Sequence, residues 1–274
     1  MKQLLLSFLI LLGFSGGIFA EDKKETVELF ILAGQSNAQG WMGDAAQYPA
    51  DPQALDAKIR FWWVFPGNSS SEGKWTTMKA QGGRFPAGHF GPEVSLARKL
   101  LKDGHQKVAV FKYCQGATSI ANNWKGPGEK GLYDDMAKQL KAAIAILEKE
   151  GLDVKVRGFF WIQGESDAQT PQMAAAYHTR LKTLVDDLRL KVLEEPKLPC
   201  LLGVDEKHEW VQKNPQVIEA QKKLASELPC AVYCPSLKDL TKADTTHLTP
   251  ESLVKQGEVL AAAWQKLTAH GARK

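Results

Sequence analysis

Short apolar runs that recur along the chain are the feature that most constrains its fold, because each has the length of one buried strand. The runs are Val27–Ala33, Ile59–Val64, Val108–Tyr113, Val156–Ile162, Leu198–Val204 and Cys230–Cys234. Segments with helical periodicity separate several of them: Glu93–Lys102, Tyr133–Lys149, Pro171–Leu193, Pro215–Leu228 and Pro250–Leu267. Near-continuous apolar strands that alternate with amphipathic helices are typical of a parallel sheet covered on both faces. We therefore expect an α/β fold, a three-layer α/β/α sandwich around a central parallel sheet of about five strands.

The first twenty residues do not fit this pattern. Lys2 gives a short positive start, Leu4–Phe14 is nearly all apolar, and Ile18-Phe19-Ala20 resembles a cleavage site. This layout predicts a secretory signal peptide over residues 1–20 and one mature domain over residues 21–274. We expect export to the periplasm or the extracellular space, with no stable membrane insertion after cleavage; an uncleaved anchor is the alternative.

Composition narrows the classes of partner. The chain is 44% hydrophobic and 24% charged, as is usual for a globular protein. Without residues 1–20 it keeps 34 basic against 31 acidic side chains, spread along its length. Binding to nucleic acid needs a concentrated basic patch, so we expect no nucleic-acid partner. The sequence leaves the oligomeric state open.

The four cysteines leave alternatives open. In an exported protein, Cys114, Cys200, Cys230 and Cys234 allow three full disulfide pairings, and buried free thiols are an equally good interpretation. Cys230 and Cys234 alone are a poor metal signal, and no close pair of histidines accompanies them. We therefore expect neither a metal nor a cofactor.

Polar residues follow three of the predicted strands. They are Gly34–Asn37, Gln115–Ser119 and Gln163–Asp167, and a fourth polar segment, Ala243–Thr249, precedes the last helix. The carboxyl ends of parallel strands meet at one edge of a sheet, where ligands bind in such folds. We therefore expect these four segments to converge on one site.

The serine, histidine and aspartate in these segments are the residue types that catalyse acyl transfer. Ser36 is a candidate nucleophile, His247 a base able to take its proton, and Asp244, three residues earlier, a carboxylate able to orient that imidazole. The N–H of Ser36, the backbone at Gly116 and the amide of Gln163 are candidate donors to an oxyanion.

Each of these residues also has a simpler interpretation. Gly-Gln-Ser-Asn is compatible with an ordinary turn, in which Gln35 and Asn37 organise the backbone rather than touch substrate. Glu165 and Asp167 are compatible with solvated helix caps. The aromatic residues of the loop-rich stretches suit either a carbohydrate groove or the core: Trp62, Trp63, Trp75, Phe85 and Trp124. His89 is a candidate for the lining of the pocket.

The ordered set of motifs resembles the SGNH/GDSL hydrolase superfamily, and within it the sialate O-acetylesterase and acetylxylan esterase group (carbohydrate esterase family six). The motifs are Gly-Gln-Ser-Asn, the glycine at the third strand, Gln-Gly-Glu-Ser-Asp and Asp-Thr-Thr-His. The resemblance spans Val27 to Gln265. The resemblance implies the flavodoxin-like SGNH fold. It also implies that Glu165 shares or replaces the role of Asp244. Gln163 departs from the asparagine usual in the superfamily.

By this resemblance Ser36 is the nucleophile, His247 the general base and acid, and Asp244 its orienting carboxylate. Ser36, Gly116 and Gln163 form the oxyanion hole, with Glu165, Gln35 and Asn37 as auxiliary candidates. We expect a carbohydrate O-acetylesterase that forms a covalent acetyl-enzyme on an acetylated glycan. The alternatives are an esterase or thioesterase for another substrate class and a non-catalytic carbohydrate-binding relative. The sequence does not separate acetylated xylan from acetylated sialic acid.

Overall fold

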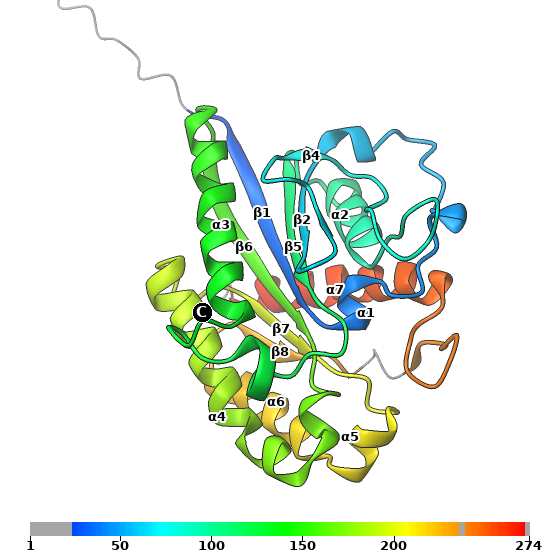
Figure 1. Ribbon diagram of the computed structural model, residues 1–274. Coiled ribbons are helices and arrows are strands. Elements are labelled where there is room, and N and C mark those ends of the chain that lie inside the picture. Colours follow the sequence, from blue (N-terminus) through cyan, green and yellow to red (C-terminus); the bar gives the residue numbers. More distant parts are fainter. Residues whose placement is uncertain (1–23, 236–238, 272–274) are drawn as a thin grey trace, which may run out of the picture.

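The computed structural model describes residues 24–235 and 239–271, so the predicted leader lies outside the described residues. Its centre is a sheet whose parallel strands follow the order β2-β5-β1-β6-β7-β8 (Figure 1). The strands are β1 (Thr26–Gly34), β2 (Ile59–Phe65), β5 (Val108–Cys114), β6 (Asp153–Ile162), β7 (Cys200–Gly203) and β8 (Ala231–Tyr233). Two short strands, β3 (Ser69–Ser70) and β4 (Thr76–Thr77), pair antiparallel with β2. The predicted α/β class with a central parallel sheet is confirmed.

The sheet differs from the expectation in two details. It has six parallel strands rather than about five, because the last apolar run also pairs, as the edge strand β8. Its order also departs from the flavodoxin-like order 2-1-3-4-5, since β5, the third parallel strand along the chain, lies between β2 and β1. Strand β1 consequently has β5 on one side and β6 on the other.

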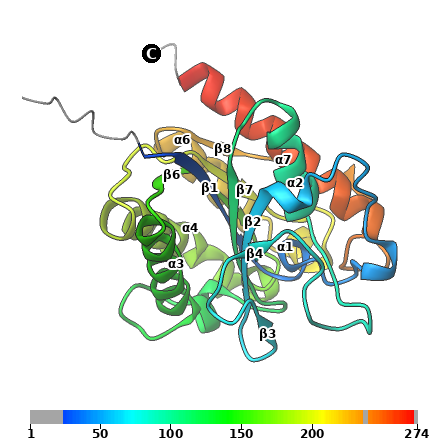
Figure 2. The ribbon, with the colours of Figure 1, turned by 90° about the horizontal axis from the view of Figure 1, so that it is seen from above.

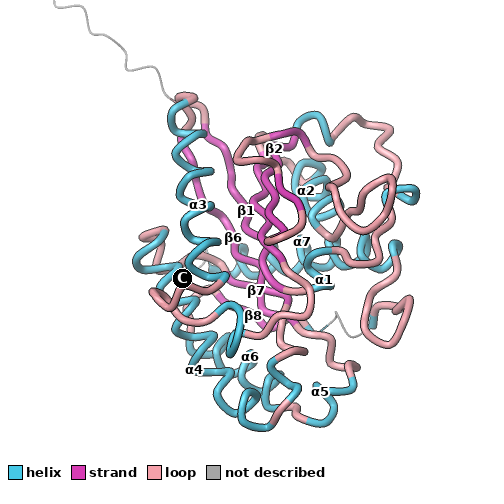
Figure 3. Tube along the Cα trace, in the orientation of Figure 1, coloured by secondary structure: helices cyan, strands magenta, loops and turns pink. Residues whose placement is uncertain are grey.

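Helices cover both faces of the sheet (Figure 2). One face packs against α3 (Leu132–Lys149), α4 (Pro171–Asp187) and α6 (Gln216–Glu227), and the other against α2 (Glu93–Lys102) and α7 (Pro250–Gly271). The short helices are α1 (Ser36–Gln39) and α5 (Glu209–Lys213), with single turns at Ala45–Gln47, Asp56–Lys58, Ile120–Trp124, Asp167–Gln169 and Leu188–Val192. The chain between α1 and α2 is mostly loop apart from β2, β3 and β4 (Figure 3). No helix of the described part of the chain is long and apolar enough to span a bilayer.

Alternation along β1 explains why it occupies the centre. Leu29 and Ile31 point into the cluster that contains α3, α4 and α6, while Phe30 and Leu32 point into the cluster that contains α2 and α7. All four are fully buried. Each buried side chain of this size contributes about 1.5–3 kcal/mol, so β1 is stabilised from both layers.

The tryptophans of the loop-rich stretches belong to the core rather than to a carbohydrate groove. Trp62 and Trp63 lie on β2, 1% and 6% exposed, and Trp124 is fully buried. Trp75 packs against the same core and donates its indole N–H to the carbonyl of Ala143. The groove interpretation of these four residues was wrong. Trp62 and Trp63 are buried because β2 is an inner strand, and Trp75 and Trp124 pack into the core that covers one face of the sheet.

Three of the cysteines carry free thiols: Cys114, Cys200 and Cys230. Burial raises the pKa of Cys114 to about 12 and that of Cys200 to about 11. Thiols of this kind stay protonated and unreactive at neutral pH. The structure thus agrees with the free-thiol interpretation for these three residues, of which Cys114 and Cys200 are buried.

A fully buried ion pair joins β5 to α2 and α1. Lys112 Nζ lies 2.6 Å from Glu93 Oε2, and both side chains are entirely inaccessible. The ammonium also donates to Gln81 Oε1 at 2.9 Å and to the carbonyl of Gln39 at 2.8 Å. Glu93 Oε1 accepts from Gln81 Nε2 and from the N–H of Gly91. Every donor of Lys112 is thus satisfied, as a buried charge requires.

We expect Lys112→Met to lower the free energy of unfolding by about 3–5 kcal/mol, because it leaves the Glu93 carboxylate buried without its cation. Urea unfolding followed by circular dichroism measures the change. Lys99→Met is the matched control: the partly exposed pair of Lys99 with Asp103, at the end of α2, is worth less than about 1 kcal/mol. Equal losses in the two variants would contradict the interpretation.

Candidate active site

The strand-to-helix turn that carries Ser36 depends on a glycine. Gly34 ends β1 with φ +145°, and a Cβ at this position would lie 2.0 Å from the carbonyl oxygen of Ile162. The N–H of Gln35 then donates to that same carbonyl at 3.0 Å, and α1 begins at Ser36. The Ser36 N–H has no acceptor within the described chain, as is usual for the first residue of a helix.

The end of β5 lies directly beside this turn. Gly34 pairs with Cys114, and the N–H of Gln115 donates to the carbonyl of Gly34 at 3.1 Å. A Cβ placed on Gly116 would lie only 3.5 Å from the Cβ of Ser36. The structure therefore brings Gly116 and Ser36 together at the carboxyl edge of the sheet.

The loop before α7 holds the imidazole of His247 against a carboxylate. His247 Nδ1 lies 2.8 Å from Asp244 Oδ2, while Asp244 Oδ1 accepts from the N–H groups of Thr246 and His247, both at 2.7 Å. Partial burial opposes ionisation of Asp244, but these hydrogen bonds outweigh it and lower its pKa to about 2. The carboxylate is therefore charged at neutral pH and orients Nδ1–H, which leaves Nε2 as the proton acceptor.

Asn37 ties this loop to α1. Its Nδ2 donates to the carbonyl of Thr246 at 3.2 Å, and its Oδ1 accepts from the N–H of Leu248 at 3.1 Å. Both contacts are to the main chain on either side of His247. Asn37 therefore organises the backbone of the site rather than the substrate. Gln35 has a comparable role, since its Oε1 accepts from the N–H of Ser166 at 3.4 Å.

Ser36 and His247 line one cavity of about 400 Å³. Gln39, Trp41, Phe65 and Gly116 contribute to the same lining. No hydrogen bond joins Ser36 to His247 within the described residues. Contacts between catalytic groups often form fully only in the complex with substrate. The ring of Trp41 lies 5.9 Å from that of His247 and borders the cavity beside it.

Gln163 is near the site but is not an oxyanion donor. Its Nε2 donates to the carbonyl of Thr118 at 3.0 Å and to Asp167 Oδ2 at 2.7 Å, which uses both of its N–H groups. Its Oε1 accepts from Tyr177. The oxyanion role expected for Gln163 was wrong, because the amide instead holds the segment after β5 to the end of β6.

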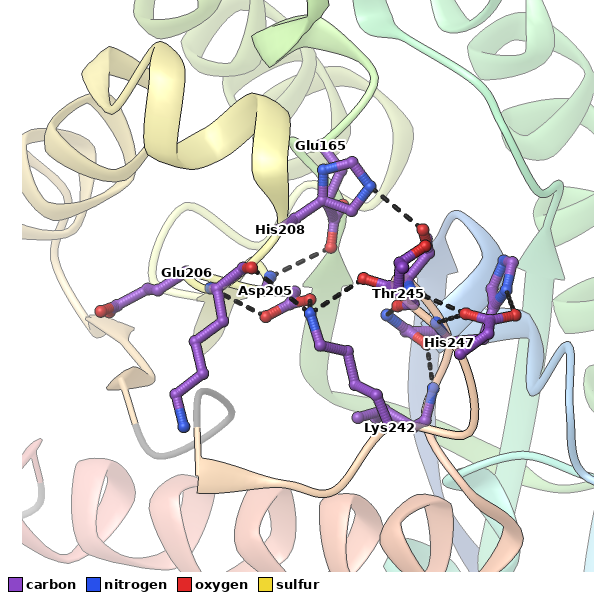
Figure 4. A network of polar contacts seen from close by, with 12 residues as sticks. Glu165, Asp205, Glu206, His208, Lys242, Thr245 and His247 are labelled. Carbon is purple, nitrogen blue, oxygen red and sulfur yellow. Dashed lines mark hydrogen bonds and ion pairs between the residues drawn. The ribbon is translucent and has the colours of Figure 1, made fainter.

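Glu165 is buried in a polar network that reaches the histidine loop (Figure 4). Its Oε1 accepts from the N–H of Asp205 at 3.0 Å, and its Oε2 has no partner within the described chain. Asp205 pairs with Lys242 at 2.8 Å, and Lys242 also donates to the carbonyl of Thr245 at 3.1 Å. Glu165 makes no hydrogen bond to His247 within the described residues, so it does not share the contact made by Asp244.

Gln39 and Trp41 are among the cavity residues that were not anticipated from the sequence. Gln39 follows Ser36 by three positions and lies on the same face of α1, and Trp41 comes just after the helix. Helical spacing from Ser36 was the signal available for Gln39. His89, expected as a candidate for the pocket lining, is instead buried behind the cavity wall, with its ring 4.8 Å from that of Phe65. Within the described residues no three side chains of His, Cys, Asp or Glu are grouped to hold a metal ion.

Glu165 should make stability depend on pH. Burial raises its pKa from 4.5 to about 7, so the folded protein binds this proton more tightly than the unfolded chain. Stability should therefore fall as pH rises from about 4.5 to about 7, and above that the full cost is about 3 kcal/mol.

Glu165→Gln keeps an oxygen for the Asp205 N–H and removes the charge. We expect the variant to gain about 3 kcal/mol on the wild type between pH 4.5 and pH 8, measured by urea unfolding at each pH. A difference between the two proteins that stays constant with pH would contradict the buried-charge explanation.

Comparison with solved structures shows proteins of the same fold. A protein of Arabidopsis thaliana superimposes with a TM-score of 0.67 at 24% identity, covering 88% of this chain and 98% of its own. NanS gives 0.63 at 16% identity, covering 92% and 99%. A carbohydrate acetylesterase of Xanthomonas citri gives 0.53 at 20% identity, covering 86% and 56%. No curated protein matches the sequence.

A family model gives more than the fold. The model described as "Carbohydrate esterase, sialic acid-specific acetylesterase" matches residues 26–266, nearly the whole described chain. The match confirms the resemblance inferred from the four motifs. The chain therefore belongs to this family of carbohydrate esterases and is a carboxylic ester hydrolase.

Proposed function

We propose that the protein removes O-acetyl groups from an acetylated sugar through a Ser36–His247–Asp244 mechanism with a covalent acetyl-enzyme. One observation carries the proposal: Ser36 and His247 line the same cavity, and the Nδ1 of that histidine is held 2.8 Å from an ionised carboxylate. A serine becomes a competent nucleophile only beside such an oriented base.

The reaction proceeds in two halves. His247 Nε2 takes the proton of Ser36 Oγ as the oxygen attacks the acetyl carbonyl carbon, and the carbonyl electron pair moves onto its oxygen. The Ser36 N–H donates to this oxyanion, and one such donor is worth about 3–4 kcal/mol. The intermediate collapses, the sugar oxygen leaves with the proton from His247, and a water activated by the same histidine releases acetate. Asp244 stabilises the imidazolium throughout, because its pKa of about 2 keeps it charged.

A cationic side chain beside the cavity residue Trp41 favours an acidic sugar. The guanidinium of Arg84 lies 5.1 Å from the ring of Trp41 and 5.4 Å from that of Phe85. Arg84 forms no ion pair within the described residues, whereas Arg60, Arg98 and Arg157 each have a carboxylate partner. An aromatic face beside an unpaired guanidinium suits a sugar ring that bears a carboxylate. Among acetylated glycans we therefore favour sialic acids over xylan, in agreement with the family description.

We expect Ser36→Ala and His247→Ala each to lower acetate release from an acetyl ester by about 10⁴-fold or more, because each removes a chemical step. Ser226→Ala on α6 and His178→Ala on α4 are matched controls away from the cavity and should keep wild-type rates. Thermal unfolding verifies that all four variants fold. Full activity in Ser36→Ala would sink the mechanism, whereas a wild-type protein inert toward every acetyl ester would favour the non-catalytic alternative.

We expect Arg84→Gln to raise KM for an O-acetylated sialic acid by about tenfold, because it removes one charged hydrogen-bond donor. KM for a neutral acetylated xylo-oligosaccharide should change by less than about twofold. Arg60→Gln, on β2 and paired with Glu150, is the control and should affect neither substrate. Equal effects of Arg84→Gln on the two substrates would argue against an acidic sugar.

A further inference from the structure

The site has one unassigned amide close to the nucleophile. With both N–H groups of Gln163 engaged, the donors expected at the oxyanion reduce to the backbone of Ser36 and Gly116. The Gly116 N–H, however, already donates to Gln39 Oε1 at 2.9 Å. The Ser36 N–H is then the one expected donor left free within the described residues, and the side chain of Gln39 lies beside Gly116 in the lining of the same cavity.

The hydrogen bond from the Gly116 N–H fixes the orientation of the Gln39 side-chain amide. The Gly116 N–H can only meet an acceptor, so the oxygen of the amide faces Gly116 and Nε2 lies on the other side of the planar group. Nε2 has no acceptor within the described chain, and it is not among the fully buried polar atoms that lack a partner. Since Gln39 lines the cavity with Ser36 and His247, we infer that its NH₂ group faces that cavity.

Gln39 is also held rigidly. It follows Ser36 by three positions on one helical turn, and its N–H donates to the carbonyl of Gln35 at 2.8 Å. Its own carbonyl accepts from the buried Lys112 ammonium at 2.8 Å. The residue is only 5% exposed. A donor held in this way needs little reorganisation during the reaction, which is the condition for strong transition-state stabilisation.

We propose that Gln39 is a catalytic residue whose Nε2 donates a hydrogen bond to the oxyanion formed on attack by Ser36. The proposal rests on the proposed function. When Ser36 Oγ bonds to the acetyl carbon, the carbonyl electron pair moves to its oxygen, which accepts from the Ser36 N–H and from Gln39 Nε2. Gly116 orients the amide through its N–H. The pair returns to the carbonyl when the sugar oxygen leaves.

Two substitutions separate a donor from a residue that only positions Gly116. Gln39→Glu keeps an oxygen for the Gly116 N–H but has no N–H of its own at neutral pH, and Gln39→Met lacks both groups at similar volume. We expect both variants to lower kcat by about 10²–10³-fold. KM should change by less than about threefold, because the ground-state carbonyl makes little use of this donor. A fall of about 2–4 °C in the unfolding temperature is expected for Gln39→Met.

Binding measurements complete the test. Phenylboronic acid forms a tetrahedral anion on a serine nucleophile, so its inhibition constant should rise about as much as kcat falls in Gln39→Met. The affinity for the deacetylated sugar should stay unchanged. Wild-type kcat in Gln39→Glu or in Gln39→Met would overturn the proposal, and so would a loss of kcat in Gln39→Met with no loss of boronic acid binding.

Activity measurements on Ser36→Ala distinguish a failure of the Gln39 proposal from a failure of the serine mechanism on which it rests. An inactive Ser36→Ala protein together with active Gln39 variants would overturn the role of Gln39 alone. An active Ser36→Ala protein would overturn the mechanism itself.

Discussion

The common end of three parallel strands is the constraint on which the site depends. Gly34 pairs with Cys114 on one side and Ile162 on the other, so β1, β5 and β6 stop at the same level. The backbones approach so closely there that a Cβ on Gly34 would lie 2.0 Å from the Ile162 carbonyl oxygen. The chain must turn at once, and the first residue able to enter a helix is Ser36. Ser36, the proposed nucleophile, therefore lies in the cavity lining just beyond the end of the strand.

Polar contacts between distant parts of the chain then hold the groups around Ser36 in place. Asn37 forms hydrogen bonds to the main chain on both sides of His247. Lys112, in its buried pair with Glu93, donates to the carbonyl of Gln39. Buried polar contacts of this kind are costly when incomplete, yet here the Lys112 donors are all matched. The hydrogen bonds of Asn37 and of the Gln39 carbonyl both lie within three residues of Ser36. Contacts that fix the backbone there preorganise the site.

The elements and the meeting of Ser36, Gly116 and His247 in one candidate site were predictable from the sequence, whereas the partners of individual side chains were not. Helical periodicity predicted the helix over Glu93–Lys102 with the bounds that the structure has. The polar segments after the strands and before the last helix predicted that Ser36, Gly116 and His247 lie at one edge of the sheet. Gln163 and Gln39 show the limit, because both are glutamines at the same edge. Which one faces the cavity depends on Thr118, Asp167 and Tyr177, and these contacts form only when the chain is folded. The groove interpretation of the β2 tryptophans was wrong for a related reason. Whether a strand is an inner strand, and so buries its side chains, depends on the whole sheet.

The two carboxyl groups near the histidine loop differ in a way that supports the different roles proposed for them. Asp244 accepts three hydrogen bonds, which lower its pKa to about 2, whereas Glu165 is fully buried with one oxygen unpartnered, which raises its pKa to about 7. Environments that push two pKa values apart give the groups different functions. A group that orients an imidazole and stabilises the imidazolium must be charged throughout the working range, and Asp244 meets this condition while Glu165 is only partly ionised at neutral pH. The histidine therefore has one permanent counter-charge, and the carboxyl of the Gln-Gly-Glu motif acts on the loop through Asp205 and Lys242.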